Sequence, residues 1–403
     1  VKSRPSRKNT IRRLQKIDKL SGNISLPSAC IASSSVNRVD TTLILTTIRV
    51  PKLLLGYVDN LKKHNHDEVE FIIIGDHKTP HKANQKLAEK ITNEGYNAQY
   101  WDVLKQKKWL SRFKELDKMV PWNSDCRRNI GYLLAYEQGA EIIIALDDDN
   151  HVTADDYFGM HGIVGTTKIF RTAFSANKWF NPCSLLTVYP NRNIYPRGFP
   201  YCRRDSDVLS WNHSAGSIVL NIGLWLNHPD VDAITNLNQT VRVTDFNSEQ
   251  VMLAPGTYTP INTQNTAFHR RVLPAYYYLP MGVNIHGQVL DRFGDIWSGL
   301  FVKKVIDKMD DRVAIGKPLT IHNRNPHDLL KDLQRETWGI IVTERLVPLI
   351  ESINLDGKTY PDVYIDLAEK LSKLDFHPNK AVKKYFEKVT LAMKTWVEIC
   401  EKL

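Results

Sequence analysis

Three consecutive aspartates, Asp147, Asp148 and Asp149, follow the apolar run IIIAL. Residues i and i+2 of a strand point the same way, so we expect Asp147 and Asp149 to share a side and Asp148 to face elsewhere. Two neighbouring carboxylates repel unless a cation lies between them, and Mg²⁺ and Mn²⁺ prefer such oxygen ligands. The pattern predicts a divalent metal site; an acidic loop that caps the next helix is the alternative.

Arginines occur at two further places where they could bind an anion. Arg127 and Arg128 lie in the first turn of a helix expected to begin at Ser124, and a helix N-terminus favours phosphate. Arginine would add a planar double donor there, although a surface salt bridge is the alternative. The segment YPRGFPYCRR contains Arg197 and Arg204 among aromatic rings, and it is either an anion site or a structural loop pinned by stacking.

Two single residues complete the candidates. Asp295, in RFGDIW, is a candidate general base towards an acceptor hydroxyl or a ligand of a sugar hydroxyl, and it also stands where a helix N-cap is expected. His322, at the end of the strand-like run LTIH, is a candidate third metal ligand through a neutral imidazole nitrogen. The alternative for His322 is an ordinary satisfied polar residue.

Alternating apolar strands and helices must position these side chains. We expect strands over residues 41–47, 70–76 and 142–146 and helices over 52–64, 81–95 and 124–139. This order predicts an α/β fold with a parallel sheet and helices on both faces, in which ligands bind beyond the carboxyl ends of the strands. Thr47-Ile48-Arg49, Gly75-Asp76 and the three aspartates should therefore converge on one site.

The rest of the chain divides into three expected regions. Residues 1–38 form a basic tail, 39–325 the α/β domain with loops and short strands over about 151–300, and 326–403 a helical region. An apolar stripe in that last region predicts core packing and no chemistry. It consists of Val382, Phe386, Val389, Met393, Trp396 and Cys400.

Composition and charge narrow the class of protein. The 403 residues are 42% hydrophobic and 24% charged, which is typical of a globular protein, and no apolar run reaches the roughly 20 residues of a membrane span. Five scattered cysteines without metal spacing favour a reducing, cytoplasmic location. Of the net charge of +10, the first twenty residues carry eight Lys or Arg and one Asp. That tail either contacts nucleic acid or an anionic surface, or docks on the body as a helix.

Several segments together resemble a known family. D-x-D at the end of a buried strand, after a helix with RRNIGY, resembles the GT-A glycosyltransferases, whose nucleotide-binding sheet is Rossmann-like. TTIR, CRRNIGY before ALDDDN, RGFPY, NIGLWLNHPDVDAITNL, RFGDIWSG and GKPLTIHNRNPHDLLKDL occur in the order seen in the reversibly glycosylated polypeptides. That family includes the plant UDP-arabinopyranose mutases, and the resemblance covers about residues 41–335.

The resemblance implies roles for particular residues. The aspartates would hold Mn²⁺ or Mg²⁺ on the diphosphate of a UDP-sugar, with metal contacts from Asp147, Asp149 and His322. Arg197 corresponds to the family's site of reversible self-glycosylation, with Arg204 as its companion. Contacts to the nucleoside are expected from Thr47, Arg49 and Asp76, contacts to phosphate from Arg128, Arg197 and Arg204, and a nucleotide contact from Asp148. The chain departs from the family at Gly294, where a second acid usually stands beside Asp295, in the segment before Tyr195 and in its basic tail.

Three functions follow from these expectations. The first is a metal-dependent glycosyltransferase with a UDP-sugar donor, in which the transition state is oxocarbenium-like and Asp295 orients or deprotonates the acceptor. The acceptor is left open among a glycan, a small molecule and a modified DNA base. The second is a mutase that interconverts pyranose and furanose forms of a UDP-sugar with self-glycosylation at Arg197. The third is a non-catalytic nucleotide-sugar-binding subunit, and a homo-oligomer is compatible with all three.

Overall fold

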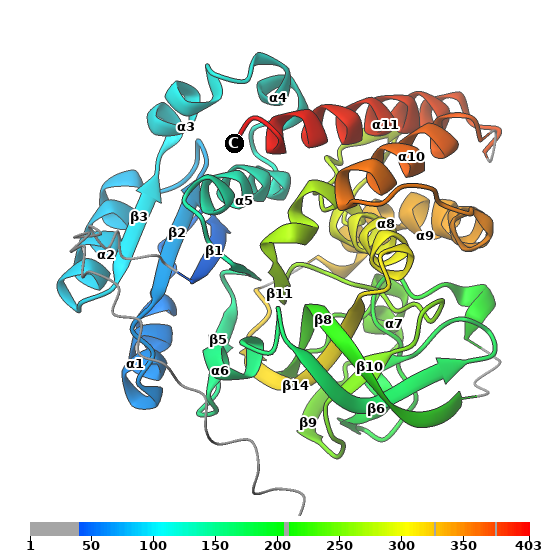
Figure 1. The fold of residues 1–403 in the computed structure, drawn as a ribbon, viewed down its shortest axis with the longest axis horizontal. Coiled ribbons are helices and arrows are strands. Elements are labelled where there is room, and N and C mark those ends of the chain that lie inside the picture. The colour runs from blue at the N-terminus through cyan, green and yellow to red at the C-terminus, as the bar shows by residue number, and fades with distance from the viewer. Residues whose placement is uncertain (1–39, 205–208, 326–327, 375–376) are drawn as a thin grey trace, which may run out of the picture. The chain divides into compact units, whose positions relative to one another are not determined.

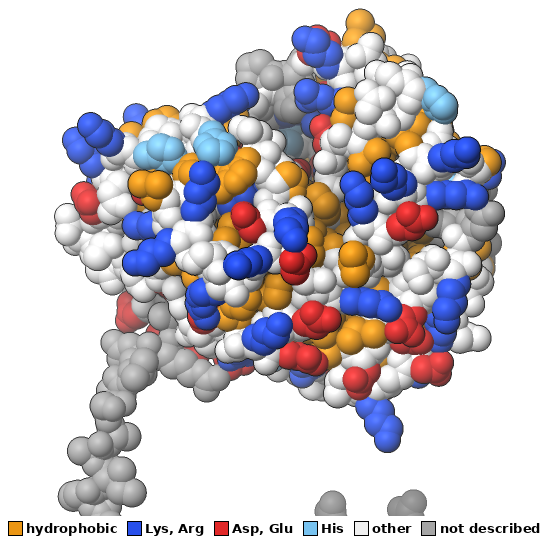
Figure 2. Space-filling model, turned by 90° about the horizontal axis from the view of Figure 1, so that it is seen from above, with side chains coloured by type: hydrophobic (Ala, Val, Ile, Leu, Met, Phe, Trp, Pro, Cys, Tyr) orange, Lys and Arg blue, Asp and Glu red, His pale blue; other side chains and the backbone are white. Residues whose placement is uncertain are grey.

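The computed structural model describes residues 40–204, 209–325, 328–374 and 377–403 (Figure 1). The predicted basic tail lies outside these residues, so its proposed contacts with nucleic acid or membranes stay predictions. Among the described helices, none is both long enough and apolar enough to cross a membrane. Four of the five cysteines are described and all four carry free thiols. The face shown in Figure 2 has basic side chains interspersed with acidic ones, as expected for a body whose net charge is small.

A large mixed sheet is the centre of the fold. Its strands run in the order β3-β2-β1-β4-β11-β8-β6-β10-β14-β5, with β7 and β9 attached beside β8, and β12 and β13 form a separate hairpin. The strands are β1 Thr41–Thr47, β2 Val69–Gly75, β3 Asn97–Trp101, β4 Ile142–Leu146, β5 Asn150–Val152, β6 Thr167–Ser175, β7 Leu186–Tyr189, β8 Leu209–Asn227, β9 Arg242–Phe246, β10 Val251–Leu253, β11 Asn265–His269, β12 Val283–Ile285, β13 Gln288–Leu290 and β14 Arg312–His322.

Helices cover this sheet and extend to the C-terminus. The α-helices are α1 Leu54–His64, α2 His81–Asn93, α3 Val103–Leu110, α4 Lys114–Met119, α5 Arg128–Glu137, α6 Tyr157–His161, α7 Ala233–Asn238, α8 Gly294–Lys308, α9 Leu329–Ser352, α10 Tyr360–Ser372 and α11 Lys380–Cys400. Short 3₁₀ turns occur at Asp125–Arg127, Pro182–Leu185, Tyr201–Arg203 and Arg270–Ala275. The α/β class with a helical C-terminal region is confirmed.

The first four strands form the predicted parallel layer. Strands β3, β2, β1 and β4 pair in parallel, and alternate residues of β1 enter two different cores. Leu43 and Leu45 pack with residues of α1 and α2, whereas Ile44 packs with residues of α4 and α5. Because both faces are covered, these strands are apolar along their whole length, which is why the sequence identified them. The strand order reverses direction between β1 and β4, and such a reversal opens a crevice at the carboxyl ends.

The middle of the chain is more regular than the sequence suggested. Instead of only short strands, β8 runs for 19 residues and pairs with β6, β11 and β14. Its first half, LSWNHSAGS, alternates between exposed and half-buried positions and contains few apolar residues. A strand with so little continuous burial gives no apolar run, so the prediction of loops here was wrong for that reason.

The C-terminal helices pack on the same core as the sheet. All six residues of the predicted stripe on α11 are buried, which confirms their packing role. Trp396 donates from its ring nitrogen to the carbonyl of Leu273 at 2.8 Å, so α11 is anchored beside the turn at Arg270–Ala275. The proposed boundary between residues 325 and 326 stays a prediction.

Candidate active site

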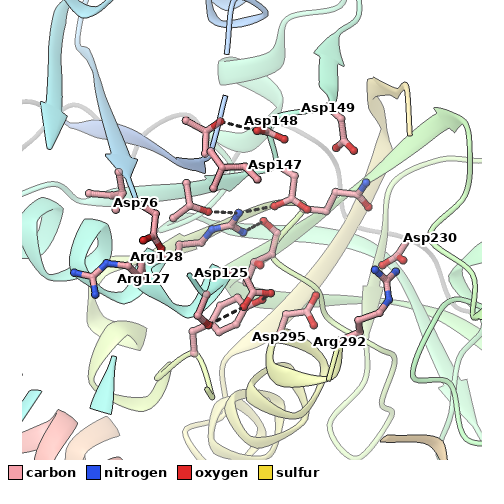
Figure 3. Close-up of a pocket in the computed structure, with 18 of the residues that line it drawn as sticks. Asp76, Asp125, Arg127, Arg128, Asp147, Asp148, Asp149, Asp230, Arg292 and Asp295 are labelled. Atoms are coloured by element: carbon pink, nitrogen blue, oxygen red, sulfur yellow. Dashed lines mark hydrogen bonds and ion pairs between the residues drawn. The ribbon is translucent and has the colours of Figure 1, made fainter. Parts of the chain in front are cut away.

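A cavity of about 440 Å³ opens where the strand order reverses (Figure 3). Thr47 ends β1, Asp76 follows β2 and the three aspartates follow β4, and all of them line the cavity, as the sequence predicted. Seven aspartates and six lysines or arginines contribute to the lining. With the two signs so nearly balanced, the affinity for an anion depends on individual pairs and on any bound metal rather than on a uniform positive field.

The three aspartates have three different partners. Strand β4 ends at Leu146, and a turn follows in which the amide of Asn150 donates to the carbonyl of Asp147 at 3.3 Å. Strand alternation therefore does not set the directions of these side chains, and a shared metal contact of Asp147 and Asp149 stays a prediction. Asp147 pairs with Arg128, Asp148 accepts from the hydroxyl of Thr47 at 2.6 Å, and Asp149 accepts from the amide nitrogen of Asn325 at 3.1 Å.

Arg128 anchors the start of α5 under the aspartates. Its guanidinium donates to the carbonyls of Thr263 and Leu146 and to the carboxylate of Asp147. Burial alone would lower the pKa of Arg128, but the charge of Asp147 outweighs it and raises the pKa. Arg128 therefore stays cationic at the floor of the cavity. Burial raises the pKa of Asp147, although the charge of Arg128 opposes this shift. The side chain of Asp147 is still 43% exposed.

Asp149 and His322 come together through strand register. Asn150 in β5 is the antiparallel partner of His322 in β14, which brings the preceding residue, Asp149, beside the imidazole. Nε2 of His322 lies 3.5 Å from Oδ2 of Asp149, while Nδ1 lies 2.7 Å from the carbonyl oxygen of His228. Donation from Nδ1 to that carbonyl leaves Nε2 facing Asp149.

Asp149 and His322 each shift the pKa of the other. Burial favours neutral His322, but the hydrogen bond and charge of Asp149 outweigh it and raise the pKa of the imidazole. Burial likewise opposes ionisation of Asp149, yet the hydrogen bond from His322 holds the pKa of the carboxyl below its ordinary value. A proton on the imidazole of His322 therefore faces the carboxylate of Asp149. A metal ion that binds both groups would have to displace that proton.

The donor set at this pair fits a divalent cation completed by substrate. Two ligands of one Mg²⁺ or Mn²⁺ ion lie within about 4 Å of each other, and the Asp149 and His322 atoms meet that condition. No three His, Cys, Asp or Glu side chains of the described residues form a complete metal group. Mg²⁺ commonly binds one or two protein ligands and takes the rest from substrate phosphates and water, so the site suits a metal that arrives with a diphosphate.

Of the three residues expected to contact the nucleoside, Asp76 and Thr47 line the cavity and Arg49 does not. Asp76 is buried at the end of β2 and accepts from the backbone amides of His77 and Asn123, both at 2.6 Å. Thr47 also lines the cavity, but the side chain of Arg49 is exposed and does not. The backbone amide of Arg49 instead donates to the hydroxyl of Thr47 at 2.9 Å.

The helix expected from Ser124 is split at its start. Residues 125–127 form a 3₁₀ turn capped by the Ser124 hydroxyl, and α5 begins at Arg128. Arg127 reaches the cavity, but its guanidinium stacks 3.3 Å from the ring centre of Trp122 and donates to Gln106 at 2.8 Å. Only Arg128 of this pair faces the aspartates (Figure 3).

Arg197 lies between two carboxylates. It donates from Nε and Nη2 to Asp230 at 3.0 Å each, and from Nη1 and Nη2 to Asp295 at 3.2 and 3.0 Å. Its Nη1 also donates to the carbonyl of Arg292. All five N–H groups of the guanidinium are therefore used within the described residues.

Asp295 is not the helix cap that the sequence suggested. Helix α8 begins at Gly294 with Phe293 at the N-cap, and Asp295 is the second helical residue. Its carboxylate faces Arg197 and the cavity instead of the helix amides. Gly294 fits because a Cβ there would lie 2.3 Å from the carbonyl oxygen of Leu279, which leaves no room for the family's second acid without a backbone shift.

Arg204 does not line the cavity. Its guanidinium donates to Asp232 at 2.8 Å and lies 3.6 Å from the ring centre of Tyr201 and 4.9 Å from that of Tyr195. The expectation that Arg204 holds phosphate charge in the cavity is therefore corrected in favour of the stacked structural loop. Aromatic neighbours and a carboxylate already satisfy this arginine away from the site.

Sequence reasoning missed five charged residues of the lining: Lys78, Asp125, Asp230, Arg292 and Arg324. Asp230 lies in NHPDVDA and Arg292 directly before FGD, so both belong to segments that the family resemblance had already marked. Arg324 follows His322 by two residues. Motif position was the available signal, but no local pattern distinguishes a charge that faces a cavity from one that faces water.

Comparisons with known proteins identify the family of the chain. The family model described as "Reversibly glycosylated polypeptide" matches residues 40–403. UDP-arabinopyranose mutase 3 of Arabidopsis thaliana is 31% identical over 294 residues, covering 70% of this chain and 74% of that protein. UDP-arabinopyranose mutase 1 of Oryza sativa subsp. japonica is 27% identical over 400 residues, covering 95% and 96%.

Solved structures show only a weak similarity. Glucosyl-3-phosphoglycerate synthase of Mycobacterium tuberculosis, in complex with Mn²⁺, UDP-glucose and phosphoglyceric acid, gives a TM-score of 0.38 at 12% identity and covers 83% of this chain and 88% of that one. A mannosyltransferase from Pyrobaculum calidifontis, in complex with GDP-Man and Mn²⁺, gives 0.35 at 12% identity, with coverage of 90% and 84%. Similarity at this level does not bear on the chemistry of the cavity.

Proposed function

The chain belongs to the reversibly glycosylated polypeptide family, and from that premise we propose that it is an enzyme that rearranges a UDP-sugar with the help of a divalent metal. The reaction we infer is that of a mutase: the bond between the sugar C1 and the diphosphate breaks, and the sugar returns to the same diphosphate in its other ring form. The observation that carries the nucleotide-sugar proposal is the Asp149–His322 pair, fixed by strand register beside the crevice between β1 and β4.

We assign the donor contacts from the two sides of the crevice. Asp76 and Thr47 would contact the nucleoside, since they end the strands on one side. Arg128 would balance phosphate charge and hold Asp147 in place, while Asp148, fixed by Thr47, would face the ribose or the phosphates. Asp149 and His322 would hold the metal, which neutralises the charge of the leaving diphosphate when it is bound.

The contacts of Asp295 favour rearrangement over transfer. Both of its oxygens accept from Arg197, so the carboxylate is not a free base waiting for an acceptor hydroxyl. A mutase has no separate acceptor hydroxyl to deprotonate, because the diphosphate that leaves C1 also attacks it again. Its proton transfer is within the sugar, from the hydroxyl that closes the new ring to the old ring oxygen. The relatives from Arabidopsis thaliana and Oryza sativa are named as mutases, which also favours a catalytic chain over a non-catalytic subunit.

Transfer to a separate acceptor is the second candidate. Gly294 stands where the family pattern has an acid, and the space at that position excludes a side chain. The two reactions share the metal, the donor and the first bond cleavage, and they differ only in the fate of the sugar.

Chromatography of the nucleotides separates these candidates. We would incubate the protein with Mn²⁺ and a panel of UDP-sugars, with Asp149→Asn as the inactive control. An isomeric UDP-sugar without UDP release is the expected result. Free UDP from one sugar would instead indicate a transferase that hydrolyses its donor slowly. If no sugar nucleotide changes in a wild-type sample that binds UDP, catalysis is refuted.

A further inference from the structure

Asp230 and Asp295 come from distant parts of the chain and meet at Arg197. We propose that these two carboxylates, bridged by Arg197, stabilise the positive charge that develops at the sugar C1 as its bond to the diphosphate breaks. We call the three residues the carboxylate clamp. In this assignment Asp230 and Asp295 face the sugar, and Arg197 is a positioning residue that acts through them. The inference rests on the proposed function.

The distances define one compact unit. Oδ2 of Asp230 and Oδ2 of Asp295 each lie 3.0 Å from the same nitrogen, Nη2 of Arg197. They are therefore no more than twice that distance apart. Enzymes that act on glycosidic bonds with retention place two carboxyl groups about 5 to 5.5 Å apart on either side of the anomeric carbon, and the clamp is compatible with that spacing.

The clamp is desolvated but still borders the cavity. The side chains of Arg197, Asp230 and Asp295 are 10%, 13% and 10% exposed, and all three line the cavity. Two carboxylates and one guanidinium leave a net charge of −1. A buried negative charge that is already oriented stabilises a developing cation more strongly than mobile water does.

The clamp lies away from the nucleoside end. Figure 3 shows Asp76 on one side of the cavity, Asp230 and Arg292 on the other, and the three aspartates between them. A UDP-sugar whose nucleoside lies at Asp76 and whose diphosphate lies at Asp149 would place its sugar towards Asp230 and Asp295. The negative clamp would then face the sugar rather than the phosphates, which it would repel.

The fold builds this arrangement from the backbone outward. The amide of Arg197 donates to the carbonyl of Asp230 at 2.8 Å, and a bridge between Pro196 and Val231 joins the same two segments. Asp295 lies in the first turn of α8, where the helix dipole favours a carboxylate. Burial raises the pKa of Asp230, but the charge and hydrogen bonds of Arg197 outweigh it and lower the pKa to about 2. The carboxylate is therefore ionised when substrate arrives.

The two aspartates are not equivalent. Asp230 accepts two hydrogen bonds from Arg197 and a third from the amide of Asn262 at 2.9 Å. Among the described residues, Asp295 accepts only the two from Arg197. More lone pairs therefore remain for substrate on Asp295, so its loss should reduce turnover more than the loss of Asp230.

The bond changes balance within the substrate. The electron pair of the C1–O bond leaves with the diphosphate oxygen, and the clamp stabilises the electron-poor C1. The sugar hydroxyl that closes the new ring then bonds to C1, the old ring bond from C1 to oxygen breaks, and the proton of that hydroxyl passes to the old ring oxygen. An oxygen of the diphosphate finally attacks C1 again, so charge and atoms balance without an oxidant or a reductant.

The test uses Asp295→Asn, Asp230→Asn and the matched control Asp232→Asn. Asp232 is a buried acid two residues from Asp230 and does not line the cavity. It pairs at 2.8 Å with Arg204, which lies in the same loop as Arg197. Asn at 232 also keeps an oxygen for the N-cap of α7. We would measure kcat and KM for the accepted UDP-sugar, and the affinities for UDP and for the UDP-sugar by calorimetry with Mn²⁺.

We expect Asp295→Asn to lower kcat by about 100-fold or more, as loss of one preorganised group does in other active sites, with KM and UDP affinity within about threefold. Asp232→Asn should keep kcat near the wild-type value. Arg197→Lys should retain more kcat than Arg197→Gln, because an ammonium still balances the carboxylates. Wild-type kcat in both clamp aspartate variants, or equal losses in all three Asn variants, would overturn the clamp.

The proposed function and the clamp fail in different ways. If the wild-type protein converts no UDP-sugar, the proposed function fails, and the clamp is then judged by binding. Clamp variants should in that case lose the extra affinity of the UDP-sugar over UDP. A UDP-sugar that binds no better than UDP to the wild-type protein, or equally well to the variants, refutes a clamp that contacts the sugar.

Discussion

Gly198 sets the position of the neighbouring Arg197, and its replacement by alanine should be costly for two separable reasons. Its φ of +83° lies in the left-handed region, where an L-residue costs about 1 to 2 kcal/mol. A Cβ at Gly198 would also lie 2.2 Å from Cγ2 of Ile296, a buried residue of α8 beside Asp295. Relief of such an overlap in a packed core typically costs about 1 to 3 kcal/mol.

Gly256 provides the matched control. Its φ is +76°, close to that of Gly198, but a Cβ there would meet nothing within 4 Å. Gly256→Ala should therefore show only the conformational cost. The two alanine variants should differ by about 2 kcal/mol in the free energy of unfolding, because only one of them collides with Ile296.

Urea unfolding followed by circular dichroism measures this difference, provided that the m-values of the variants agree. In an Ile296→Ala background the cost of Gly198→Ala should fall, since the colliding methyl group is gone. Gly198→Ala in the wild-type background should also lower kcat, because relief of the overlap with Ile296 moves Arg197 away from Asp295. Equal destabilisation by Gly198→Ala and Gly256→Ala, within about 0.5 kcal/mol of each other, would show that the packing against Ile296 does not fix this loop.

Three further predictions concern pH, metal and modification. His161 is buried, and burial lowers its pKa to about 4, so between pH 6.5 and 4 the unfolded chain binds a proton that the folded chain does not. The free energy of unfolding should therefore fall by up to about 3 kcal/mol as the pH decreases over that range. In acid titrations of stability, His161→Gln should flatten this dependence. Asp149→Asn should weaken Mn²⁺-dependent UDP binding by about 100-fold in calorimetry, since a ligand should matter at least as much as the outer-shell groups whose loss costs 10- to 100-fold, and unchanged binding would remove Asp149 from the metal site. The family resemblance implies self-glycosylation at Arg197, but all five donors of that guanidinium are engaged in the structure. Native protein incubated with its UDP-sugar should therefore carry no sugar on Arg197 by peptide mass spectrometry, and a stoichiometric adduct there would show that the contacts with Asp230 and Asp295 open during turnover.

The sequence predicted the elements that carry the first half of the site. The β1, β2 and β4 runs are apolar because both faces of the sheet are covered, and each ends in polar residues that the parallel arrangement must bring to one edge. Thr47, Asp76 and the three aspartates were therefore placed correctly. The stripe on α11 was equally clear, because helical periodicity is written in a short stretch of chain.

Contacts between distant segments were less accessible. Asp149 and His322 were both named from the sequence, but only the register of β5 against β14 decides that they face each other. Asp230 was not named at all, since one acid in a polar segment has no local signal for burial. The side-chain partners of Asp147 depended on where the turn after β4 begins, which strand alternation cannot supply.

Arg197 and Arg204 show the division most clearly. They lie in one loop, among the same kinds of neighbours, and the same role was expected of both. Their acids, Asp230 and Asp232, are likewise two residues apart, yet only the first pair lines the cavity. By itself the sequence determined strands β1, β2 and β4 with their polar ends, the helical C-terminus and the family. The tertiary structure decided which charges face the cavity, because that depends on long-range packing against α8, which no local pattern encodes.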